Sequence, residues 1–333
     1  MTSTTDSLLA EVGTGTGAQL AMSVAYTTAP PGPTFLPELD ALLLSARPHA
    51  GGSSLQRGDL VELTGASGSG KSTLLTFLLM TALLPPTLPE TAVPLGGRGM
   101  RAALLSLPSH PPSRIARSMR AHIARCCAAA THSATPPEID AVVDAALARL
   151  TVLRLRPRAT PWTLALRRLL ALEESPALIV ADGLGDGYWP ERWAEETRSA
   201  GRSVHDAGMR DIWDALTALR AQLGAVVIVT VQGLRPAGDR FKSHLPAPYP
   251  GPSDAGRKWP LSIHITLLGP ARPLQLPAES TLAEALRARH QADVRTYHAV
   301  VRVPGGAGMV GTPAGARFSF GISEHGLVPF NAS

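Results

Sequence analysis

The chain of 333 residues is poor in cysteine, and its two cysteines, Cys126 and Cys127, are adjacent. Two neighbouring cysteines cannot build a disulfide framework, so the sequence is typical of a reducing compartment. No run of 18 apolar residues occurs, which argues against a membrane-spanning helix. The N-terminus also lacks the basic start and long apolar core of a secretory signal, and we expect none. The ten histidines show no ligand-like spacing, so no structural zinc site is predicted.

Lysine is scarce as well. Of 31 basic Lys and Arg residues, only three are lysines: Lys71, Lys242 and Lys258. Such a bias toward arginine makes each remaining lysine informative. Twelve arginines and only three acidic residues fall between Arg98 and Arg168. This region could face nucleic acid or an acidic partner, or it could be a solvated surface that reflects the arginine bias.

Residues 1–33 are rich in Thr, Ser, Gly and Pro and are expected to form a flexible N-terminal arm. Short apolar runs then alternate with helical patterns, which predicts a parallel sheet covered on both faces. Strands are expected at 60–63, 101–107, 151–155, 177–182, 225–232, 261–268, 297–303, 316–322 and 326–330. Helices are expected at 35–46, 71–84, 113–130, 136–150, 161–175, 211–224 and 279–291.

The regular pattern fails after Gln232. Residues 233–258 have no periodicity and are crowded with Pro and Gly, so they are expected to form a long mobile loop. No internal repeat or second core is visible. The sequence therefore predicts one core domain, residues 34–331, in which an α/β sheet ends in a smaller C-terminal β extension.

The segment "GASGSGKS" matches the phosphate-loop pattern G-x-x-x-x-G-K-[ST] between an expected strand and an expected helix. Glycines let backbone N–H groups curl around phosphate oxygens, and the helix N-terminus favours an anion. In this pattern Lys71 would neutralise the β- and γ-phosphates and the Ser72 hydroxyl would bind Mg²⁺. The predicted nucleotide-binding residues here are Gly65, Ala66, Ser67, Gly68, Ser69, Gly70, Lys71, Ser72 and Thr73.

Two strand-end residues are candidates for completing this site. Asp182 follows the apolar run "LIVA" and could join Ser72 in the Mg²⁺ shell. Gln232 ends the run "VVIVTVQ" and could sense the γ-phosphate. The alternatives are a strand-end Asp that caps a turn and an ordinary strand-end polar residue.

A hydrolytic site also needs a residue that orients or deprotonates the attacking water. Many phosphate-loop ATPases use a Glu directly after the strand-end Asp or at the end of the neighbouring strand. The first position here is Gly183, and no Asp or Glu occurs between Met100 and Pro137. His110 is the remaining titratable candidate near the second position. The sequence therefore predicts ATP binding with weak or absent hydrolysis, and no catalytic residue is located.

The order of these motifs resembles the core of RecA/RadA-type recombinases, and more specifically the eukaryotic recombinase paralogues of the X-ray-repair cross-complementing group. The likeness rests on "GDLVELTGASGSGKSTLL", "ALIVADGLGDGYWPER", "VVIVTVQ", "GRKWPLSIHITLL" and "ARFSFGISEHGLV". These segments span roughly residues 35 to 330. The phosphate loop alone is unspecific, whereas the Tyr-Trp pair after Asp182 and the spacing of all five segments are more specific.

The resemblance implies a RecA-like fold, DNA double-strand-break and crosslink repair by homologous recombination, nuclear localisation, and assembly with other recombinase paralogues. It also implies ATP and Mg²⁺ as cofactors, with Gln232 as the γ-phosphate sensor. The loop after Gln232 would correspond to a DNA-binding loop for single-stranded or branched DNA. Its basic residues would contact phosphates, and the candidates are Arg235, Arg240, Lys242, Arg257 and Lys258.

Three departures from the recombinases stand out. The catalytic Glu has no counterpart near residues 107–110, the F-x-x-A polymerisation segment is absent, and only a short arm precedes Phe35 in place of a helical DNA-binding domain. These departures favour an accessory subunit over a self-assembling strand-exchange enzyme. The expected partner surface is the region from Ala25 to Leu44.

Other classes of protein also contain a phosphate loop. An active recombinase or DNA-stimulated ATPase remains the main alternative, with a catalytic base that the motifs do not reveal. An ATP-binding cassette would need an L-S-G-G-Q-type signature and a Glu after Asp182, and neither is present. A small-molecule kinase with a phosphate loop fits poorly, because the chain has a long basic loop in place of a compact lid.

Overall fold

The computed structural model of the chain describes residues 31–48, 52–106, 112–156, 158–198, 209–237, 240–243, 261–271, 281–284, 294–312 and 314–330, with residues 17, 24 and 279 in isolation. The chain divides into two units, Met1–Pro30 and Pro31–Ser333. All the elements below belong to the second unit, and the predicted arm falls mainly outside the described residues. None of the described helices is long and apolar enough to cross a membrane.

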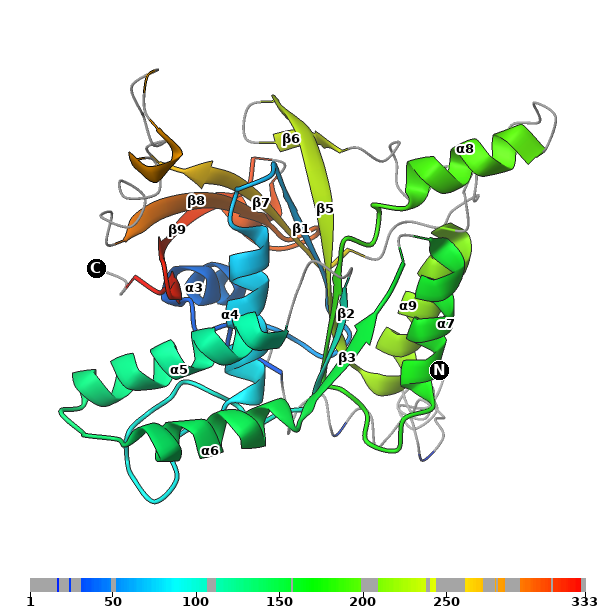
Figure 1. Ribbon diagram of the computed structural model, residues 1–333. Helices are drawn as coiled ribbons and strands as arrows, with labels where there is room; N and C mark the ends of the chain where they lie inside the picture. The colour runs from blue at the N-terminus through cyan, green and yellow to red at the C-terminus, as the bar shows by residue number, and fades with distance from the viewer. Residues whose placement is uncertain are drawn as a thin grey trace, which may run out of the picture. The chain divides into compact units, whose positions relative to one another are not determined.

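The described strands form one sheet, which develops from the short apolar runs of the sequence (Figure 1). The strands are β1 (Leu60–Gly65), β2 (Ala102–Ser106), β3 (Leu150–Arg154), β4 (Leu178–Asp182), β5 (Val226–Ala237), β6 (Arg240–Ser243), β7 (Ile263–Pro270), β8 (Arg295–Arg302), β9 (Ala316–Ser323) and β10 (Gly326–Val328). Their order across the sheet is β10-β9-β8-β7-β1-β5-β4-β2-β3, and β6 pairs with β5.

The sheet has two parts with different strand directions. The parallel centre comprises β7, β1, β5, β4, β2 and β3, each parallel to its neighbours within this group. The antiparallel extension comprises β8, β9 and β10, which continue from β7 as successive antiparallel neighbours. This arrangement confirms the predicted α/β fold with a mostly parallel sheet and a smaller C-terminal β extension.

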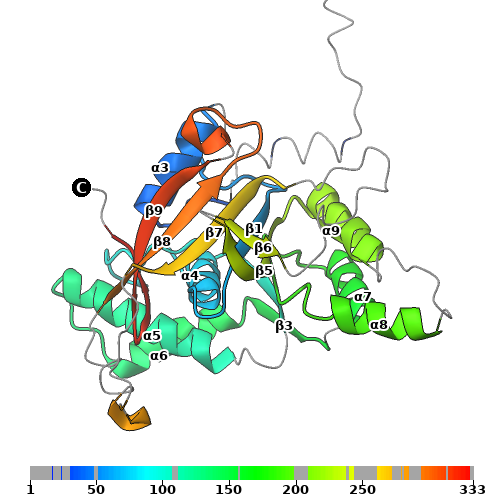
Figure 2. The same ribbon diagram turned by 90° about the horizontal axis from the view of Figure 1, so that it is seen from above.

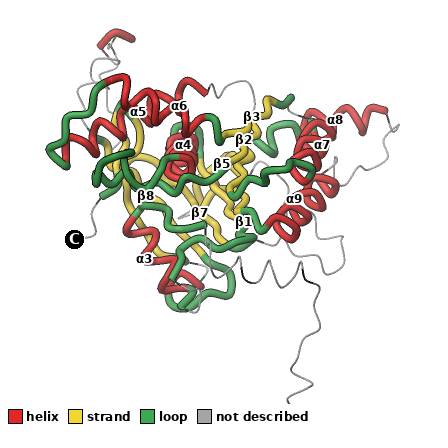
Figure 3. The backbone as a smooth tube through the Cα atoms, turned by 90° about the horizontal axis from the view of Figure 1, so that it is seen from below, coloured by secondary structure: helices red, strands yellow, loops and turns green. Residues whose placement is uncertain are grey.

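Helices cover both faces of the sheet (Figures 2 and 3). Towards one face lie α3 (Pro37–Ala46), α4 (Lys71–Leu83), α5 (Pro112–Ala129) and α6 (Pro136–Leu147), and towards the other lie α7 (Ala159–Leu170), α8 (Tyr188–Arg198) and α9 (Met209–Leu223). Helix α4 is apolar on all sides and buries every residue from Leu74 to Leu83. This burial suits a helix enclosed between the sheet and other helices.

Side-chain alternation along the central strands creates two separate apolar cores. In β4, Leu178 and Val180 pack with the α3–α6 side, whereas Ile179 and Ala181 pack with the α7 and α9 side. Successive residues of a strand point to opposite faces, so a strand covered on both sides must be apolar throughout. The continuous apolar runs in the sequence follow from this burial on both faces.

Part of the predicted partner surface, at the start of the core domain, is buried inside the protein. Leu36 is 3% exposed, and Leu39 and Leu43 of α3 are also enclosed by the core. Glu38 accepts a hydrogen bond from the Ser319 N–H at 2.8 Å, which ties α3 to β9. Residues 36, 39 and 43 therefore hold the fold together and are not free for a partner. Residues 25–30 of the predicted surface lie outside the described residues.

The predicted boundary of the loop after Gln232 is wrong at its start. Strand β5 continues to Ala237 and forms an antiparallel hairpin with β6, with a bulge between Gly233 and Arg235. The Pro and Gly residues concealed this strand in the sequence, because Pro is tolerated where a strand lies at the margin of a sheet. The rest of the predicted loop lies outside the described residues, which omit 238, 239 and 244–260.

Helix α8 was not foreseen from the sequence. It begins at Tyr188, directly after the turn that follows β4, and Pro190 lies in its first turn. A proline at this place removes no intrahelical hydrogen bond, so it does not prevent the helix from starting.

Candidate nucleotide-binding site

The phosphate-loop residues form a tight turn between β1 and α4. Strand β1 ends at Gly65, and α4 begins at Lys71. Gly68 and Gly70 have φ angles of 77° and 96°, in the left-handed region where glycine is favoured. The Ser69 N–H donates to the Ala66 carbonyl oxygen at 3.2 Å, which closes the turn. The loop thus faces the end of α4 where unpaired N–H groups favour an anion.

Position 65 has no room for a side chain, so only glycine fits there. A Cβ atom at this position would lie 2.5 Å from Ser69 Oγ and 2.8 Å from the Leu267 carbonyl oxygen, too close for any real side chain. The Ser69 hydroxyl itself is buried, and it has no hydrogen-bond partner within the described part of the chain. A buried polar group of this kind normally acquires a partner, and a phosphate oxygen could supply it here.

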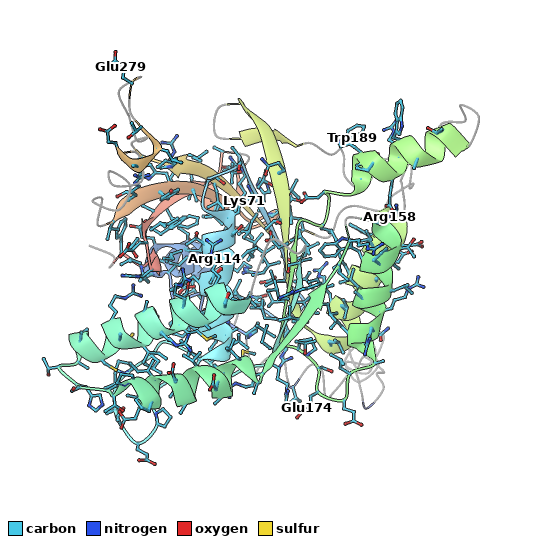
Figure 4. The ribbon with its side chains drawn as sticks, viewed as in Figure 1. Lys71, Arg114, Arg158, Glu174, Trp189 and Glu279 are labelled. Atoms are coloured by element: carbon cyan, nitrogen blue, oxygen red, sulfur yellow. The ribbon has the colours of Figure 1, made fainter. Side chains whose placement is uncertain are left out.

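Lys71 points into the loop from the first turn of α4 (Figure 4). Its Nζ donates hydrogen bonds to the carbonyl oxygens of Gly65 at 2.6 Å and Ala66 at 2.8 Å, and to Gln232 Oε1 at 3.3 Å. Burial lowers the pKa of the Lys71 ammonium, and the negative charges of Asp182 and Asp186 oppose this shift. The ammonium therefore lies where it can meet either these carboxylates or an incoming phosphate.

Neighbouring strands place Asp182 and Gln232 beside this loop. Gln232 is the strand partner of Gly65, because β1 and β5 are parallel and adjacent. Asp182 ends β4, the next strand across, and its Oδ1 accepts a hydrogen bond from Thr230 Oγ1 at 2.7 Å. Thr230 Oγ1 in turn accepts from the Gly183 N–H at 2.8 Å. Carboxyl ends of parallel strands share one edge, which is why residues 50 apart in sequence meet there.

These groups line one cavity of about 420 Å³. Of the residues predicted from the sequence, the cavity is lined by Ser67, Gly68, Ser69, Gly70, Lys71, Ser72, Thr73, Asp182 and Gln232. Gly65 and Ala66 lie just behind it and supply the carbonyls that bind Lys71. The structure thus brings the predicted site residues together, and their roles toward a ligand stay predictions.

The cavity is also lined by residues outside the predicted nucleotide-binding set. The additional described residues that line it are Arg114, Gly183, Asp186, Thr230, Tyr297 and Ile322. Arg114 comes from the start of α5 (Figure 4) and donates from Nη2 to Thr73 Oγ1 at 3.3 Å. Tyr297 and Ile322 come from β8 and β9, so the antiparallel extension forms one wall. The sequence carried a signal for Gly183, which directly follows the candidate Mg²⁺ ligand, and for Asp186, which follows that ligand by four residues in a glycine-rich turn.

The donor set fits a nucleotide with Mg²⁺. The loop offers backbone N–H groups and an ammonium to phosphates, and Ser72 and Asp182 offer a hydroxyl and a carboxylate to the metal. Within the described residues, no group of three or more His, Cys, Asp or Glu side chains could hold a metal ion without further ligands. Phosphate oxygens and water would therefore complete the coordination of Mg²⁺, as is usual for this ion.

The two usual positions for a catalytic Glu contain no carboxylate. Gly183 follows Asp182 and has a φ angle of 82°, which suits glycine. The segment after β2, residues 107–111, lies outside the described residues, and it contains neither Asp nor Glu. His110, the remaining candidate there, therefore has no described position.

The five DNA-binding candidates divide between the hairpin and the undescribed loop. The backbones of Arg235, Arg240 and Lys242 lie on the β5–β6 hairpin, where residues 235 and 242 are strand partners. Arg257 and Lys258 lie outside the described residues. Arg235 follows Gln232 on β5, and the backbones of Arg240 and Lys242 lie on the paired strand β6.

Comparison with known proteins bears on this architecture. No protein-family model and no curated protein sequence matches the chain. The crystal structure of the RadB recombinase superposes on 90% of this chain and 99% of its own length, with a TM-score of 0.51 and 17% sequence identity. The chain has a RecA-like fold. At 17% identity this likeness shows the fold alone.

Proposed function

We propose that the protein is an ATP-binding accessory subunit of a recombinase-paralogue complex that repairs DNA double-strand breaks and crosslinks by homologous recombination. The observation that carries the proposal is a complete phosphate-binding cavity without a carboxylate at either usual catalytic position. Such a site can bind ATP with Mg²⁺ and hydrolyse ATP slowly. Bound nucleotide would then stabilise the folded subunit in proportion to its concentration relative to the dissociation constant.

The RecA-like fold supports a role in recombination, and the sequence motifs narrow the proposal to the recombinase paralogues. The motif order resembles that of the second member of the X-ray-repair cross-complementing group. The absence of an F-x-x-A segment from the sequence favours assembly with other paralogues over self-polymerisation. The proposal includes nuclear localisation, and the DNA would be single-stranded or branched and bound through the complex.

The hairpin and the following segment are the proposed DNA contact. Replacing Arg240, Lys242, Arg257 and Lys258 together with Gln should weaken DNA binding by the purified complex and flatten its dependence on salt. Unchanged affinity at both low and high salt would show that this segment does not touch phosphates. Replacement of Arg317, which is exposed on β9, is a control because it removes positive charge outside both the hairpin and the Arg98–Arg168 region.

Affinity purification of the chain followed by mass spectrometry tests the proposed assembly. Recovery of other recombinase paralogues is the expected result, and recovery of none under conditions that preserve nucleotide binding would contradict it. Steady-state ATPase assays with and without DNA separate this proposal from the alternative of an active DNA-stimulated ATPase. Turnover faster than about 1 s⁻¹, within the ordinary range for enzymes, would favour that alternative.

A further inference from the structure

The turn between β4 and α8 contains Asp186. Leu184 and Tyr188 on either side are each 3% exposed and pack into the core, whereas Asp186 itself is exposed. The Asp186 N–H donates to the Gly183 carbonyl oxygen at 3.0 Å, which closes the turn. Two buried anchors therefore hold the turn, and the carboxylate between them remains accessible to water.

Asp186 lines the same cavity as Lys71, Ser72 and Gln232. Asp186 therefore shares the cavity in which Lys71 would meet the β- and γ-phosphates of ATP.

Two carboxylates line the cavity among the described residues, and their surroundings differ. Asp182 ends a strand, receives the Thr230 hydroxyl, and faces the cavity beside Ser72, as a ligand of Mg²⁺ should. Asp186 comes from a turn beyond the strand end and is open to solvent. Hydrolysis needs one carboxylate for the metal and another acceptor for the water, and this cavity offers both.

We propose that Asp186 is the catalytic carboxylate of ATP hydrolysis in this chain, shifted from the two usual positions to the turn after β4. The inference rests on the proposed ATP site. The carboxylate accepts a hydrogen bond from a water molecule beside the γ-phosphate. As the water oxygen bonds to the γ-phosphorus, the bond to the β,γ-bridging oxygen breaks and ADP leaves with that electron pair. The water proton passes to Asp186, and inorganic phosphate is released.

The principal test is Asp186→Asn, which keeps the shape of the side chain and removes its ability to take a proton. The single-turnover rate of ATP hydrolysis should fall about 100-fold, within the range for loss of a general base. The dissociation constant for ATP with Mg²⁺, and the Mg²⁺ concentration needed for binding, should each change by less than about threefold. Asp186→Glu should restore part of the rate. Asp211→Asn, on the exposed start of α9, is the matched control and should keep the full rate.

A second measurement does not depend on turnover. ADP with aluminium fluoride imitates the transition state, so the wild-type protein should bind this complex more tightly than ADP alone. Asp186→Asn should bind ADP normally and lose at least about tenfold in affinity for ADP with aluminium fluoride. An amide at position 186 that leaves both the rate and this affinity unchanged would overturn the proposal.

The outcomes distinguish this inference from the proposed function. If the wild-type protein binds ATP but does not hydrolyse it with or without DNA, Asp186 is not catalytic and the nucleotide-binding subunit survives. A variant with weakened Mg²⁺ dependence would make Asp186 a metal ligand and would also overturn the inference. If ATP does not bind the wild-type protein, both proposals fail.

Discussion

The parallel centre and the antiparallel extension meet at the nucleotide cavity, and they contribute different chemistry to it. The parallel centre ends in the groups that suit phosphate and metal, among them Lys71, Asp182 and Gln232. The antiparallel extension contributes the side chains of Tyr297 and Ile322. Their contact is close, since a Cβ at Gly70 would lie 3.0 Å from Ile322 Cδ1 and 3.4 Å from Tyr297 Cδ1. The polar half of the site and its less polar wall thus come from separate parts of the sheet.

The largest effect is expected where α3 supports the extension. Leu36→Asp would bury a carboxylate in the core and remove apolar contacts, so the free energy of unfolding should fall by at least about 4 kcal/mol. This loss is a large part of the stability of an ordinary domain. Urea denaturation measures it. Ala41→Asp, on the exposed side of α3, should change stability by less than about 1 kcal/mol.

Lys71→Ala should remove the ammonium group that would bind the phosphates, while leaving the fold intact. Affinity for both ATP and inorganic tripolyphosphate should fall about 100-fold, which corresponds to about 2.7 kcal/mol. Titration calorimetry measures both ligands. In cells, survival after DNA crosslinking should suffer less from Lys71→Ala than from loss of the gene if the protein acts mainly as a subunit. Equal damage would contradict that reading.

Gly70→Ala tests the junction between the two parts, and Gly68→Ala is its control. Both positions have left-handed φ angles, so each substitution should cost about 1–2 kcal/mol of backbone strain. Only position 70 also brings the new methyl group against Ile322, because no atom lies within 4 Å of a Cβ at Gly68. Thermal unfolding should therefore show a larger loss for Gly70→Ala. Adding Ile322→Val should recover the difference, and equal losses for the two glycines would show that the extension does not press on the loop.

The smallest effect on binding is expected at the cavity wall that the antiparallel extension forms. We expect the Tyr297 ring to contact the nucleotide base, so Tyr297→Ala should weaken ATP binding about tenfold, a typical contribution of one aromatic contact to a base. Binding of tripolyphosphate, which has no base, should change little. This contrast with Lys71→Ala would separate the two parts of the site by ligand. A similar loss for both ligands would mean that Tyr297 shapes the phosphate loop instead.

The sequence by itself determined the parts of this protein that depend on neighbouring residues. The phosphate loop could be recognised because left-handed φ angles at Gly68 and Gly70 are a local property that only glycine adopts readily. The strand ending at Asp182 could be recognised because a strand buried on both faces must be apolar throughout. The alternation of strands and helices was sufficient to predict the α/β fold.

Tertiary structure alone decided the rest. Tyr297 and Ile322 lie more than 220 residues from the phosphate loop, and only the strand order of the sheet brings them to it. The β5–β6 hairpin exists through pairing between strands, which local composition concealed behind Pro and Gly. Whether Leu36 meets the core or a partner, and whether Asp186 faces the cavity or bulk water, depends on how the elements pack. Local patterns specify backbone conformation, but contacts between distant segments are set by the free energy of the whole packed core.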